Sequence, residues 1–218
     1  MDNYYQCANS AYEHTLIDIL NNGKTFDNTL ALFNVGFYLI DPLKNEITNK
    51  KRKWLKEYAE AEWQWYLSGN RNIKELGEIY GKIPAIWTNM ADIEGNVNSN
   101  YGWQWNRNNQ INNVIDLLRK KPDTRKATIS IYDGKEINNY TKDTPCTYAI
   151  QFTIVDKKLN MCVTMRSNDI WYGFCNDQYC FSKLQEMISN ELCIKIGTYY
   201  HFAHNMHIYD DKLKQLKL

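Results

Sequence analysis

Helical periodicity dominates the first half of the chain. Apolar residues recur at spacings of three and four over residues 8–21 and 53–67, a pattern typical of helices that bury one face. A turn-forming pair of asparagine and glycine follows each pattern, where a helix commonly ends. A third pattern of this kind covers residues 109–120 before Pro122, which cannot continue a helix. We therefore expect three helices, the second of which carries Glu62.

Extended segments become frequent in the second half. Apolar and polar residues alternate along two neighbouring segments, and the short polar stretch between them suits a hairpin. The strands that we expect lie at residues 29–40, 127–132, 148–154, 159–165, 194–200 and 206–209, and a last helix covers 178–193. No internal repeat, linker or low-complexity tract separates these elements. The pattern predicts a single domain over residues 1–218 of the α/β (α+β) class, with a mixed β-sheet flanked by helices.

The expected strand over residues 159–165 has a polar face as well as an apolar one. Alternation places Asn160, Cys162, Thr164 and Arg166 opposite the apolar residues. We expect this polar face to look into water, a subunit contact or a polar cavity.

Charge and cysteine content argue against several classes of protein: those that coat nucleic acid, secreted proteins and membrane proteins. The 26 basic and 25 acidic side chains nearly cancel, so we do not expect a protein that coats nucleic acid through its phosphates. None of the six cysteines forms a C-x-x-C pair and the N-terminus lacks the pattern of a secretory signal, which favours a reduced, cytoplasmic protein. No apolar run reaches the roughly 20 residues that a membrane helix needs. We therefore expect neither a nucleic acid nor a membrane as partner.

A cysteine at the start of an expected strand is the sharpest chemical feature. Cys146 lies in Thr144-Pro145-Cys146-Thr147, directly after a polar turn. A lone cysteine is more often a small buried hydrophobe than a nucleophile, so this segment alone leaves both interpretations open. Three later segments shift the balance: Met165-Arg166-Ser167-Asn168-Asp169, Gly173-Phe174-Cys175-Asn176-Asp177 and His207-Ile208-Tyr209.

These segments, in this order and at these separations, resemble the thymidylate synthase family. The resemblance runs from about residue 24 to residue 209 and includes Glu62 within 61–67, Trp87, and residues 98–103 and 123–126. Within the family, the motifs look most like bacteriophage deoxycytidylate hydroxymethylases. The resemblance implies a thymidylate synthase-like fold, a sheet-to-sheet homodimer, and 5,10-methylenetetrahydrofolate as the one-carbon donor to a pyrimidine deoxynucleoside monophosphate. If the protein is encoded by a phage, it would work in the host cytoplasm.

The expected chemistry explains why such residues are needed. A thiolate that adds to carbon 6 of a pyrimidine makes carbon 5 nucleophilic toward the methylene group of the donor. Cys146 would be this thiolate, and Arg166 would be the cationic neighbour that lowers its pKa. The resemblance adds Tyr101 to the catalytic set and makes Glu62 a proton carrier, with a pKa raised by burial among aromatic residues. Taken alone, the helix equally fits an exposed glutamate paired with a lysine.

The resemblance also implies the binding residues. Asp169 would hydrogen-bond the pterin of the folate, and Trp87 and Gly173 would shape its slot; an aspartate in this position could instead cap a turn. The residues implied for the nucleotide are Arg166, Ser167 and Lys24 at the phosphate, Arg125 and Lys126 donated between subunits, and His207 and Tyr209 at the sugar. Lysine stands at 24 and 126 where the family usually has arginine, which keeps the charge and loses the two-pronged hydrogen bond.

Asp177 indicates which base is bound. Synthases that act on uracil carry asparagine at the matching position, where an amide donates to the carbonyl at position 4 and accepts from N3–H. Cytosine presents the reverse pattern, which a protonated carboxyl fits because it can donate to N3 and accept from the amino group. The alternative is an exposed N-cap, since Asp177 precedes the helix expected at 178–193. With the carboxyl in the site, we expect dCMP as substrate.

The last step decides between a methyl and a hydroxymethyl product, because exclusion of water from the site favours hydride transfer. Thr147 replaces the histidine that follows the nucleophile in synthases, and nine residues follow Tyr209 where synthases close the site with a C-terminal tail. Both differences favour hydration to 5-hydroxymethyl-dCMP. Alternatives stay open: a thymidylate synthase or hydroxymethylase acting on dUMP, a cytosine-directed methylase, or a non-catalytic nucleotide-binding relative. Retention of Cys146, Glu62 and Arg166 together argues against the last of these.

A spacing of three among His201, His204 and His207 invites a metal-site interpretation. In a strand these side chains would lie on alternating faces, and no carboxylate or cysteine set completes a group of ligands. We therefore expect no metal.

Overall fold

The computed structural model describes residues 3–140 and 142–216, most of which belong to helices and strands. The strands are β1 (Asn3–Tyr5), β2 (Lys24–Phe26), β3 (Thr29–Leu39), β4 (Thr128–Ser130), β5 (Thr147–Val155), β6 (Lys158–Met165), β7 (Asn168–Asp169) and β8 (Lys195–Tyr209). The α-helices are α1 (Ala8–Asn22), α2 (Lys56–Ser68), α3 (Ile73–Tyr80), α4 (Ala85–Met90), α5 (Tyr101–Asn106), α6 (Gln110–Lys120), α7 (Gly173–Glu191) and α8 (Asp210–Leu216). Two short 3-10 turns are η1 (Arg107–Asn109) and η2 (Ile137–Asn139).

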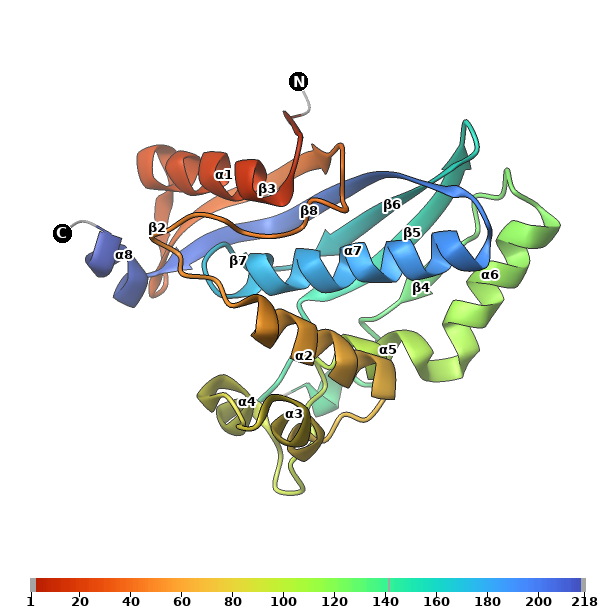
Figure 1. Cartoon of the computed structure of the whole chain (residues 1–218). Coiled ribbons are helices and arrows are strands. Elements are labelled where there is room, and N and C mark those ends of the chain that lie inside the picture. Colours follow the sequence, from red (N-terminus) through yellow and green to blue (C-terminus); the bar gives the residue numbers. More distant parts are fainter. Residues whose placement is uncertain (1–2, 141, 217–218) are drawn as a thin grey trace.

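The strands join in one mixed sheet. Its order is β1-β3-β8-β6-β5-β4, with β2 beside β3 and β7 beside β8 (Figure 1). β8 runs antiparallel to β3 and parallel to both β6 and β7, so it contacts strands from both halves of the chain. The mixed sheet flanked by helices that the sequence predicts is confirmed. Its arrangement brings the ends of β5, β6 and β7, where the family motifs lie, to the same region of the molecule.

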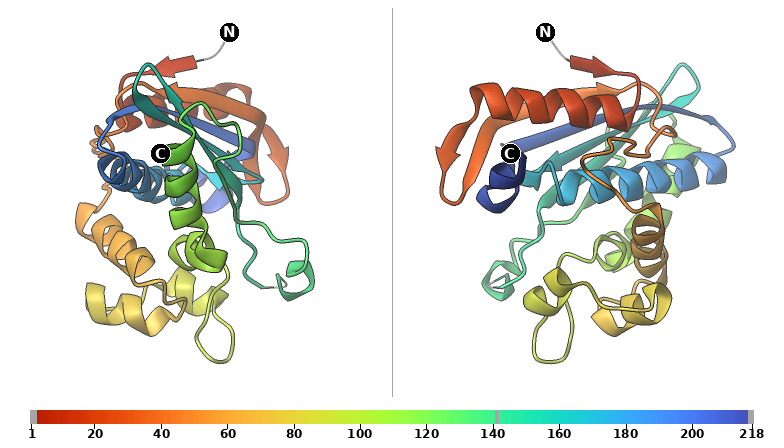
Figure 2. Two further views of the ribbon diagram at one scale, coloured as in Figure 1. Left: turned by 90° about the vertical axis from the view of Figure 1, so that its right-hand side faces the viewer. Right: turned by 60° about the vertical axis from the view of Figure 1, so that its left-hand side comes forward.

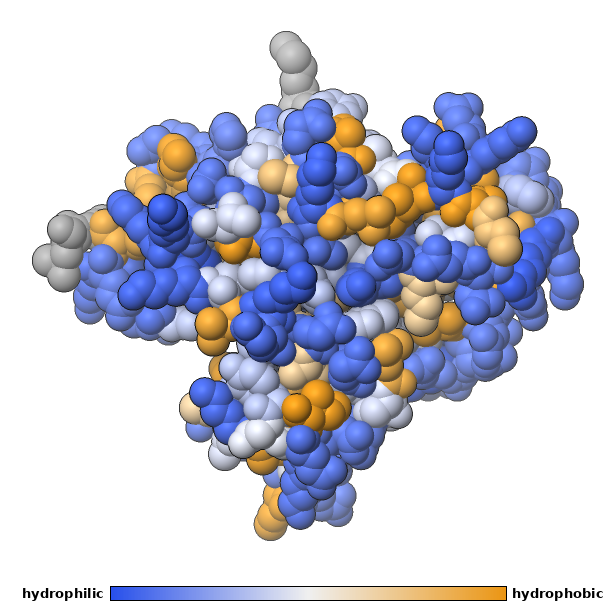
Figure 3. Space-filling view, viewed as in Figure 1, coloured by the Kyte–Doolittle hydropathy of each residue, from blue (hydrophilic) through white to orange (hydrophobic). Residues whose placement is uncertain are grey.

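Helices α1 and α7 cover one face of the sheet (Figures 1 and 2). α1 packs on β3, α7 packs on β6 and β8, and α2 lies against α7 on the side away from the sheet. Fully buried aromatic side chains fill the sheet–helix layer, among them Phe37, Phe152, Phe174 and Phe181. Burial of each such side chain contributes roughly 1.5–3 kcal/mol. On the side shown in Figure 3, hydrophilic residues cover most of the surface, with smaller hydrophobic groups between them.

The opposite face of the sheet is less covered. Along β8, Tyr199, His201 and Ala203 are buried toward the helices, whereas Phe202 is partly exposed and His204 is exposed. β6 alternates in the same way, as its sequence pattern predicts, with buried apolar residues and half-buried polar ones. The chain therefore presents a broad surface of β-strands that its own helices do not bury.

Two predicted elements differ from the structure. The helix predicted over 178–193 begins at Gly173, because Gly173, Asn176 and Asp177 are weak helix formers and hide its first turn from the pattern. The pieces predicted at 194–200 and 206–209 are one continuous strand, β8, whose middle contains a buried histidine. Several short elements were not predicted at all: β1, β2, β7, α3, α4, α5 and α8.

In the part of the chain that the structure describes, none of the helices combines the length and the apolar character needed to cross a membrane.

Candidate active site

Cys146 and Arg166 are in direct contact. Cys146 lies just before β5, and Arg166 follows β6, the strand paired with β5. The Arg166 side chain donates hydrogen bonds to the carbonyl oxygens of Thr144 (2.8 Å) and Pro145 (3.0 Å), and its Nη2 lies 3.6 Å from the Cys146 sulfur. The guanidinium therefore holds the segment that carries the cysteine in place.

The electrostatics of the thiol differ from the sequence expectation. Burial raises the pKa of Cys146 to about 11, and the nearby Arg166 opposes this effect without cancelling it. The carboxylate of Asp177 adds to the increase. The cysteine is therefore a protonated thiol at neutral pH in this structure, and an attack on an electrophile must include the loss of that proton.

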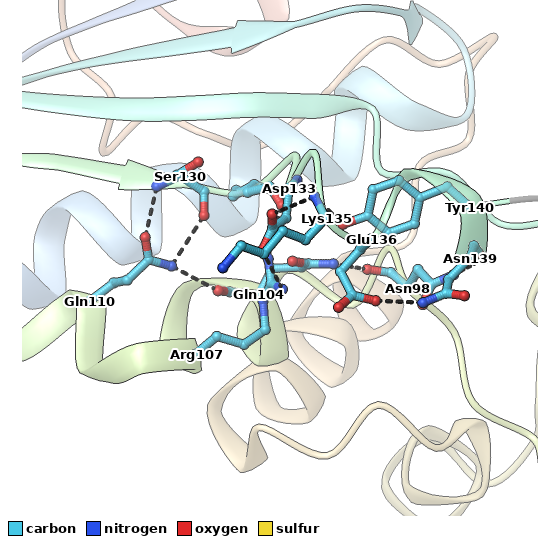
Figure 4. A network of polar contacts seen from close by, with 11 residues as sticks. Asn98, Gln104, Arg107, Gln110, Ser130, Asp133, Lys135, Glu136, Asn139 and Tyr140 are labelled. Carbon is cyan, nitrogen blue, oxygen red and sulfur yellow. Dashed lines mark hydrogen bonds and ion pairs between the residues drawn. The ribbon is translucent and has the colours of Figure 1, made fainter.

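Side chains from α6 and from the segment before α5 fix the loop between β4 and β5, which ends at the cysteine (Figure 4). Gln110 exchanges hydrogen bonds with the backbone of Ser130, at 2.9 and 3.1 Å. The Asn98 amide donates to the carbonyls of Asn139 (3.2 Å) and Asp143 (3.0 Å). These bonds satisfy backbone N–H and C=O groups that helices and strands do not pair. They therefore fix the loop that leads to the candidate nucleophile.

Glu62 lies buried on α2, with 4% of its surface exposed. Burial raises its pKa to about 8, and the neighbouring carboxyl of Asp177 adds to the increase. The Tyr58 hydroxyl donates to Glu62 Oε1 at 3.2 Å and accepts from the indole N–H of Trp87 at 2.8 Å. On the other side, Asn176 hydrogen-bonds Glu62. The exposed, lysine-paired alternative for Glu62 is therefore wrong.

Asp177 lies within the first turns of α7 and points to the same region. It is not an exposed N-cap: burial raises its pKa to about 7, and residue 172 caps the helix. The Asn168 amide donates to Asp177 Oδ2 at 2.7 Å. Tyr101, fully surrounded by protein, has a pKa well above its usual value because of burial, with Asp177 and Cys146 among its electrostatic neighbours. The structure thus brings Cys146, Arg166, Glu62, Tyr101 and Asp177 together.

Asp169 caps the turn that leads into α7. Its two oxygens accept from the backbone N–H groups of Trp171 (2.9 Å) and Tyr172 (3.0 Å), so the turn-capping alternative is confirmed. Burial raises the pKa of Asp169 to about 7. Gly173 follows this turn, where an added Cβ would crowd Asp177 Oδ2 at 3.2 Å. A contact of Asp169 with a pterin stays a prediction.

The sheet register relates three of the residues predicted to bind the nucleotide or folate. His207 on β8 pairs with Asp169 on β7 and with Ala31 on β3, which in turn pairs with Lys24 on β2. Neighbouring strands are about 4.8 Å apart, so these residues form one row across the sheet. His207 is buried, which lowers its pKa, and its ring lies 5.0 Å from that of Tyr209. Lys24 is exposed at the end of this row.

The remaining residues predicted to bind the nucleotide lie at different positions across the sheet. Ser167 is half-buried between β6 and β7, directly after Arg166. Arg125 and Lys126 are exposed just before β4, the edge strand farthest from β2. They therefore lie toward the opposite edge of the sheet from Lys24.

Several residues of the site escaped the sequence interpretation. Tyr58, Asn168, Asn176 and His201 all contact the two carboxyl groups or their partners. Asn168 and Asn176 stand in motif segments where no role was assigned to them, and His201 was considered only as a possible metal ligand. A signal was present for His201, because it alternates with Tyr199 and Ala203 on the buried face of a strand, where a polar side chain needs a hydrogen-bond partner.

Within residues 3–140 and 142–216, no group of three or more histidine, cysteine, aspartate or glutamate side chains is arranged to hold a metal ion.

Comparisons with known proteins agree with this geometry. The family model described as Thymidylate synthase matches residues 10–218. Deoxycytidylate 5-hydroxymethyltransferase of Enterobacteria phage T4 is 38% identical over 177 residues, covering 77% of this chain and 68% of the relative. Deoxyuridylate hydroxymethyltransferase of Delftia phage PhiW-14 is 32% identical over 201 residues, covering 87% of this chain and 54% of that relative.

A solved structure has the same fold. Thermostable thymidylate synthase A from Bacillus subtilis superposes with a TM-score of 0.80 at 22% sequence identity, over 96% of this chain and 82% of that chain. The predicted thymidylate synthase-like fold is therefore confirmed. With the family model matching nearly the whole length, the chain belongs to the thymidylate synthase family.

Proposed function

We propose that this protein transfers a one-carbon unit from 5,10-methylenetetrahydrofolate to carbon 5 of dCMP and releases 5-hydroxymethyl-dCMP. One observation carries the proposal: a cysteine contacted by a guanidinium lies near a carboxyl whose pKa is raised to about 7. The first group can attack carbon 6 of a pyrimidine, and the second can stay protonated to pair with cytosine. The resemblance to a deoxycytidylate 5-hydroxymethyltransferase at 38% identity supports the same substrate.

Cys146 performs the addition. Its sulfur attacks carbon 6, and electron density moves through carbon 5 into the ring. Because the thiol pKa is raised to about 11, the proton passes to a water molecule as the bond to carbon 6 forms. Arg166, 3.6 Å away, stabilises the developing negative charge on sulfur. The clamp that Arg166 places on Thr144 and Pro145 keeps the sulfur in position for this attack.

Asp177 selects the base and assists the addition. A neutral carboxyl donates to N3 of cytosine and accepts from its amino group, a pairing that uracil does not match. Donation to N3 also withdraws electrons from the ring when Cys146 attacks. The raised pKa of Asp177 supports this role, because the carboxyl keeps its proton up to about neutral pH.

Glu62 moves protons during the later steps. Its pKa of about 8 lies near neutral pH, where a carboxyl can both accept and return a proton. Tyr58 and Asn176 hold it from two sides, so its position is fixed while its protonation changes. We assign to Glu62 the removal of the carbon 5 proton through water, and to Tyr101 the ordering of that water near Asp177 and Cys146.

The residues around α4 and the start of α7 suit the folate. When bound, the folate supplies a methylene carbon at the oxidation level of formaldehyde. Trp87 is half-buried and its indole N–H is already bonded to Tyr58, which leaves the ring face for stacking. Asp169 is fixed by two backbone donors and can hydrogen-bond a pterin from its remaining lone pairs, or from its proton. Gly173 keeps the space beside it open.

Phosphate and sugar binding complete the site. We assign the phosphate to Arg166, Ser167 and Lys24, and the sugar hydroxyl to His207 and Tyr209. Arg125 and Lys126 lie at the far edge of the sheet, so their use at the phosphate requires a second subunit. A homodimer through the uncovered face of the sheet, where Phe202 is only half-buried, supplies them and removes this apolar surface from water.

The hydroxymethyl product follows from the side chain beside the nucleophile. Thr147 is fully buried and follows Cys146 directly, with a small neutral hydroxyl where synthases carry histidine. A smaller side chain here leaves more room for water, which can add to the exocyclic methylene before hydride does.

The test is incubation of the protein with 5,10-methylenetetrahydrofolate and each pyrimidine monophosphate in turn, followed by mass analysis of the nucleotide. We expect dCMP to gain one CH2O unit, and Cys146→Ser to give no product. Gain of CH2O by dUMP instead would favour the second candidate, a deoxyuridylate hydroxymethyltransferase, to which the 32% identity of the Delftia phage relative points. Unchanged nucleotides in every incubation would contradict both.

A further inference from the structure

We propose that Asn168 and His201 are positioning residues that determine which oxygen of Asp177 carries the acid proton, and thereby which pyrimidine base the site accepts. The inference rests on the proposed function, since it concerns how Asp177 recognises a base. Both side chains are buried, and their hydrogen bonds connect Asp177 with the core of the sheet.

A chain of three hydrogen bonds links Asp177 to the core of the sheet. The Asn168 amide nitrogen donates to Asp177 Oδ2 at 2.7 Å. The Asn168 carbonyl oxygen lies 3.1 Å from His201 Nε2. The other ring nitrogen, His201 Nδ1, lies 2.8 Å from the hydroxyl of Tyr199. All three supporting side chains are buried, with 2% of the surface of Asn168 exposed and none of that of His201 or Tyr199.

The donors and acceptors fix one direction for this chain. A neutral imidazole has one N–H donor and one acceptor nitrogen. Because the Asn168 oxygen can only accept, His201 Nε2 carries the hydrogen, and Nδ1 accepts from the Tyr199 hydroxyl. If Asn168 turned its amide over, His201 would have to donate to Tyr199, and the buried Tyr199 hydroxyl would lose the acceptor that it has in the described residues. Loss of a buried hydrogen bond destabilises the fold, so the observed direction is preferred.

The surroundings of His201 keep it neutral. Its ring stacks on Phe37 at a centroid distance of 5.3 Å and meets the edge of Phe174 at 5.2 Å. Burial among these rings lowers the pKa of His201 to about 3. The imidazole therefore stays a one-donor, one-acceptor group throughout the pH range in which the protein works, and the direction of the chain does not change with pH.

The surroundings of Asp177 favour its protonated form. The carboxyl groups of Glu62 on α2 and Asp169 on β7 face it. The other acidic groups that face it are thiols and phenols: Cys146 before β5, Cys175 and Cys180 on α7, Tyr66 on α2, Tyr101 on α5 and Tyr199 on β8. Gly173 packs against the bond itself, where an added Cβ would lie 3.0 Å from Asn168 Nδ2 and 3.2 Å from Asp177 Oδ2. The pair thus has no opposing cation among these groups, and Gly173 lies directly beside their hydrogen bond.

These constraints give Asp177 a fixed order of donor and acceptor. Oδ2 accepts from Asn168, so the acid proton resides on Oδ1, and Oδ2 keeps a second lone pair for another donor. The carboxyl then offers a donor beside an acceptor, which matches N3 and the amino group of cytosine. Uracil offers the reverse order, N3–H and a carbonyl oxygen, and would leave buried polar groups unpaired.

The test is the double variant Tyr199→Phe, His201→Phe, which removes both hydrogen-bonding groups behind Asn168 while keeping aromatic rings of similar shape. Replacing both partners by apolar rings leaves no unpaired group between positions 199 and 201, and the Asn168 oxygen is the buried group that loses its partner. Circular dichroism of the variant checks that the fold is retained. The matched control is His14→Phe, the same substitution at an exposed histidine on α1. The readout is release of tritium from carbon 5 of dCMP and of dUMP as a function of pH.

We expect the ratio of kcat/KM for dCMP to that for dUMP to fall roughly tenfold or more in the double variant, because the Asn168 amide can turn over. The hydrogen bond from Asn168 lowers the pKa of Asp177, so its loss moves the alkaline decline of the dCMP reaction to higher pH. The His14 variant keeps the ratio of the unmodified protein. Parallel losses for both nucleotides at an unchanged ratio and pH profile would overturn the proposal, since a merely structural role predicts that result.

Nitrogen NMR of the histidine rings tests the chain itself, with no need for activity. We expect His201 to show a protonated Nε2 and an accepting Nδ1 between about pH 5 and pH 9, because burial keeps the ring neutral. A ring with its hydrogen on Nδ1 would overturn the proposal. If neither nucleotide released label, the proposed function would fail, and the nitrogen spectrum would still decide the direction of the chain.

Discussion

Burial outweighs local charge at the individual residues of this site. Arg166 lies 3.6 Å from the Cys146 sulfur, yet burial keeps the thiol pKa near 11. The pKa values of Glu62 and Asp177 rise to about 8 and about 7 for the same reason. Desolvation penalises the charged form of each group, so the protonated, neutral forms are favoured near neutral pH. Such a site suits a reaction in which protons move on and off a neutral pyrimidine ring.

Tyr58 connects the indole of Trp87 with Glu62, and its hydrogen bond lowers the pKa of that carboxyl. We predict that Tyr58→Phe raises the pKa of Glu62, so that the acid limb of the pH–rate profile moves to higher pH and kcat near neutral pH falls by roughly tenfold. Tritium release from dCMP over a range of pH measures both effects. Tyr80→Phe is the matched control, because Tyr80 is a ring neighbour of Tyr58 at 5.2 Å. Equal profiles for the two variants would argue against the link.

The residues that the sequence predicts for the centre of the site are those with a chemical signature. Cys146, Glu62 and Arg166 stand in motifs, and the structure brings them together. Their supporting partners are harder to assign from the sequence: Tyr58 stands in no motif, and the pattern around His201 indicates only that a buried ring needs a hydrogen-bond partner, because such a residue acquires its role from what folds against it. The turn-capping role of Asp169 was open in the sequence for the same reason.

At the level of elements, close packing of α2 against α5 holds Glu62 and Tyr101 near each other. Gly102 permits this contact, because an added Cβ would lie 1.9 Å from the Tyr66 carbonyl oxygen. We predict that Gly102→Ala lowers the free energy of unfolding by about 3 kcal/mol or more, since rigid backbone must move. Gly134→Ala is the control, because a Cβ there meets nothing within 4 Å. Urea unfolding of both variants measures the difference, and equal stabilities would contradict the packing argument.

Elements with strong periodicity could be predicted, and those fixed by tertiary contacts could not. The alternation in β5 and β6 is visible in the sequence because one side of each strand is buried. The middle of β8 is different, since His201 is buried there, His204 is exposed, and the apolar pattern breaks. The start of α7 was missed because its first turn serves the site, with Gly173 and Asp177 in place of strong helix formers.

For the whole molecule, the buried carboxyl groups predict an unusual dependence of stability on pH. The pKa values of Glu62, Asp169 and Asp177 rise from 4.5, 3.8 and 3.8 in the unfolded chain to about 8, about 7 and about 7. Between these values the folded state binds more protons than the unfolded state, so the free energy of unfolding falls as pH rises. Glu60 and Asp92, whose pKa values are lowered, act mainly below this window. Burial also lowers the pKa values of His201 and His207, which opposes the trend below about pH 6.5 without reversing it, because the three carboxyl groups act over a wider range.

We therefore expect the protein to be more stable at about pH 5.5 than at about pH 8.5 in urea titrations. Glu62→Gln removes one of the titrating groups and should make the dependence shallower. Stability that rises with pH across this window, or an unchanged slope in the variant, would contradict the assignment of protonated buried acids.

We expect a dimer to form through the face of the sheet that the helices leave uncovered. Phe202 is only half-buried on that face, and a second subunit would cover it and supply Arg125 and Lys126. We predict that Phe202→Lys gives a monomer with much lower activity, because charged side chains oppose the burial of an apolar interface. Ile17→Lys, on an exposed position of α1, should leave the dimer intact. Sedimentation equilibrium distinguishes the two, and a dimer that survives Phe202→Lys would exclude this face as the interface.

The central claim is that Cys146 saturates the ring of a pyrimidine that Asp177 has selected. Its most direct measurement is competition between dCMP and dUMP, both tritiated at carbon 5, for one preparation of the protein with 5,10-methylenetetrahydrofolate. We predict release from dCMP faster by roughly two orders of magnitude, loss of that preference in Asp177→Ala, and no release from either nucleotide in Cys146→Ser. Release from dUMP at an equal or greater rate, or label that still leaves dCMP in the Cys146 variant, would contradict it.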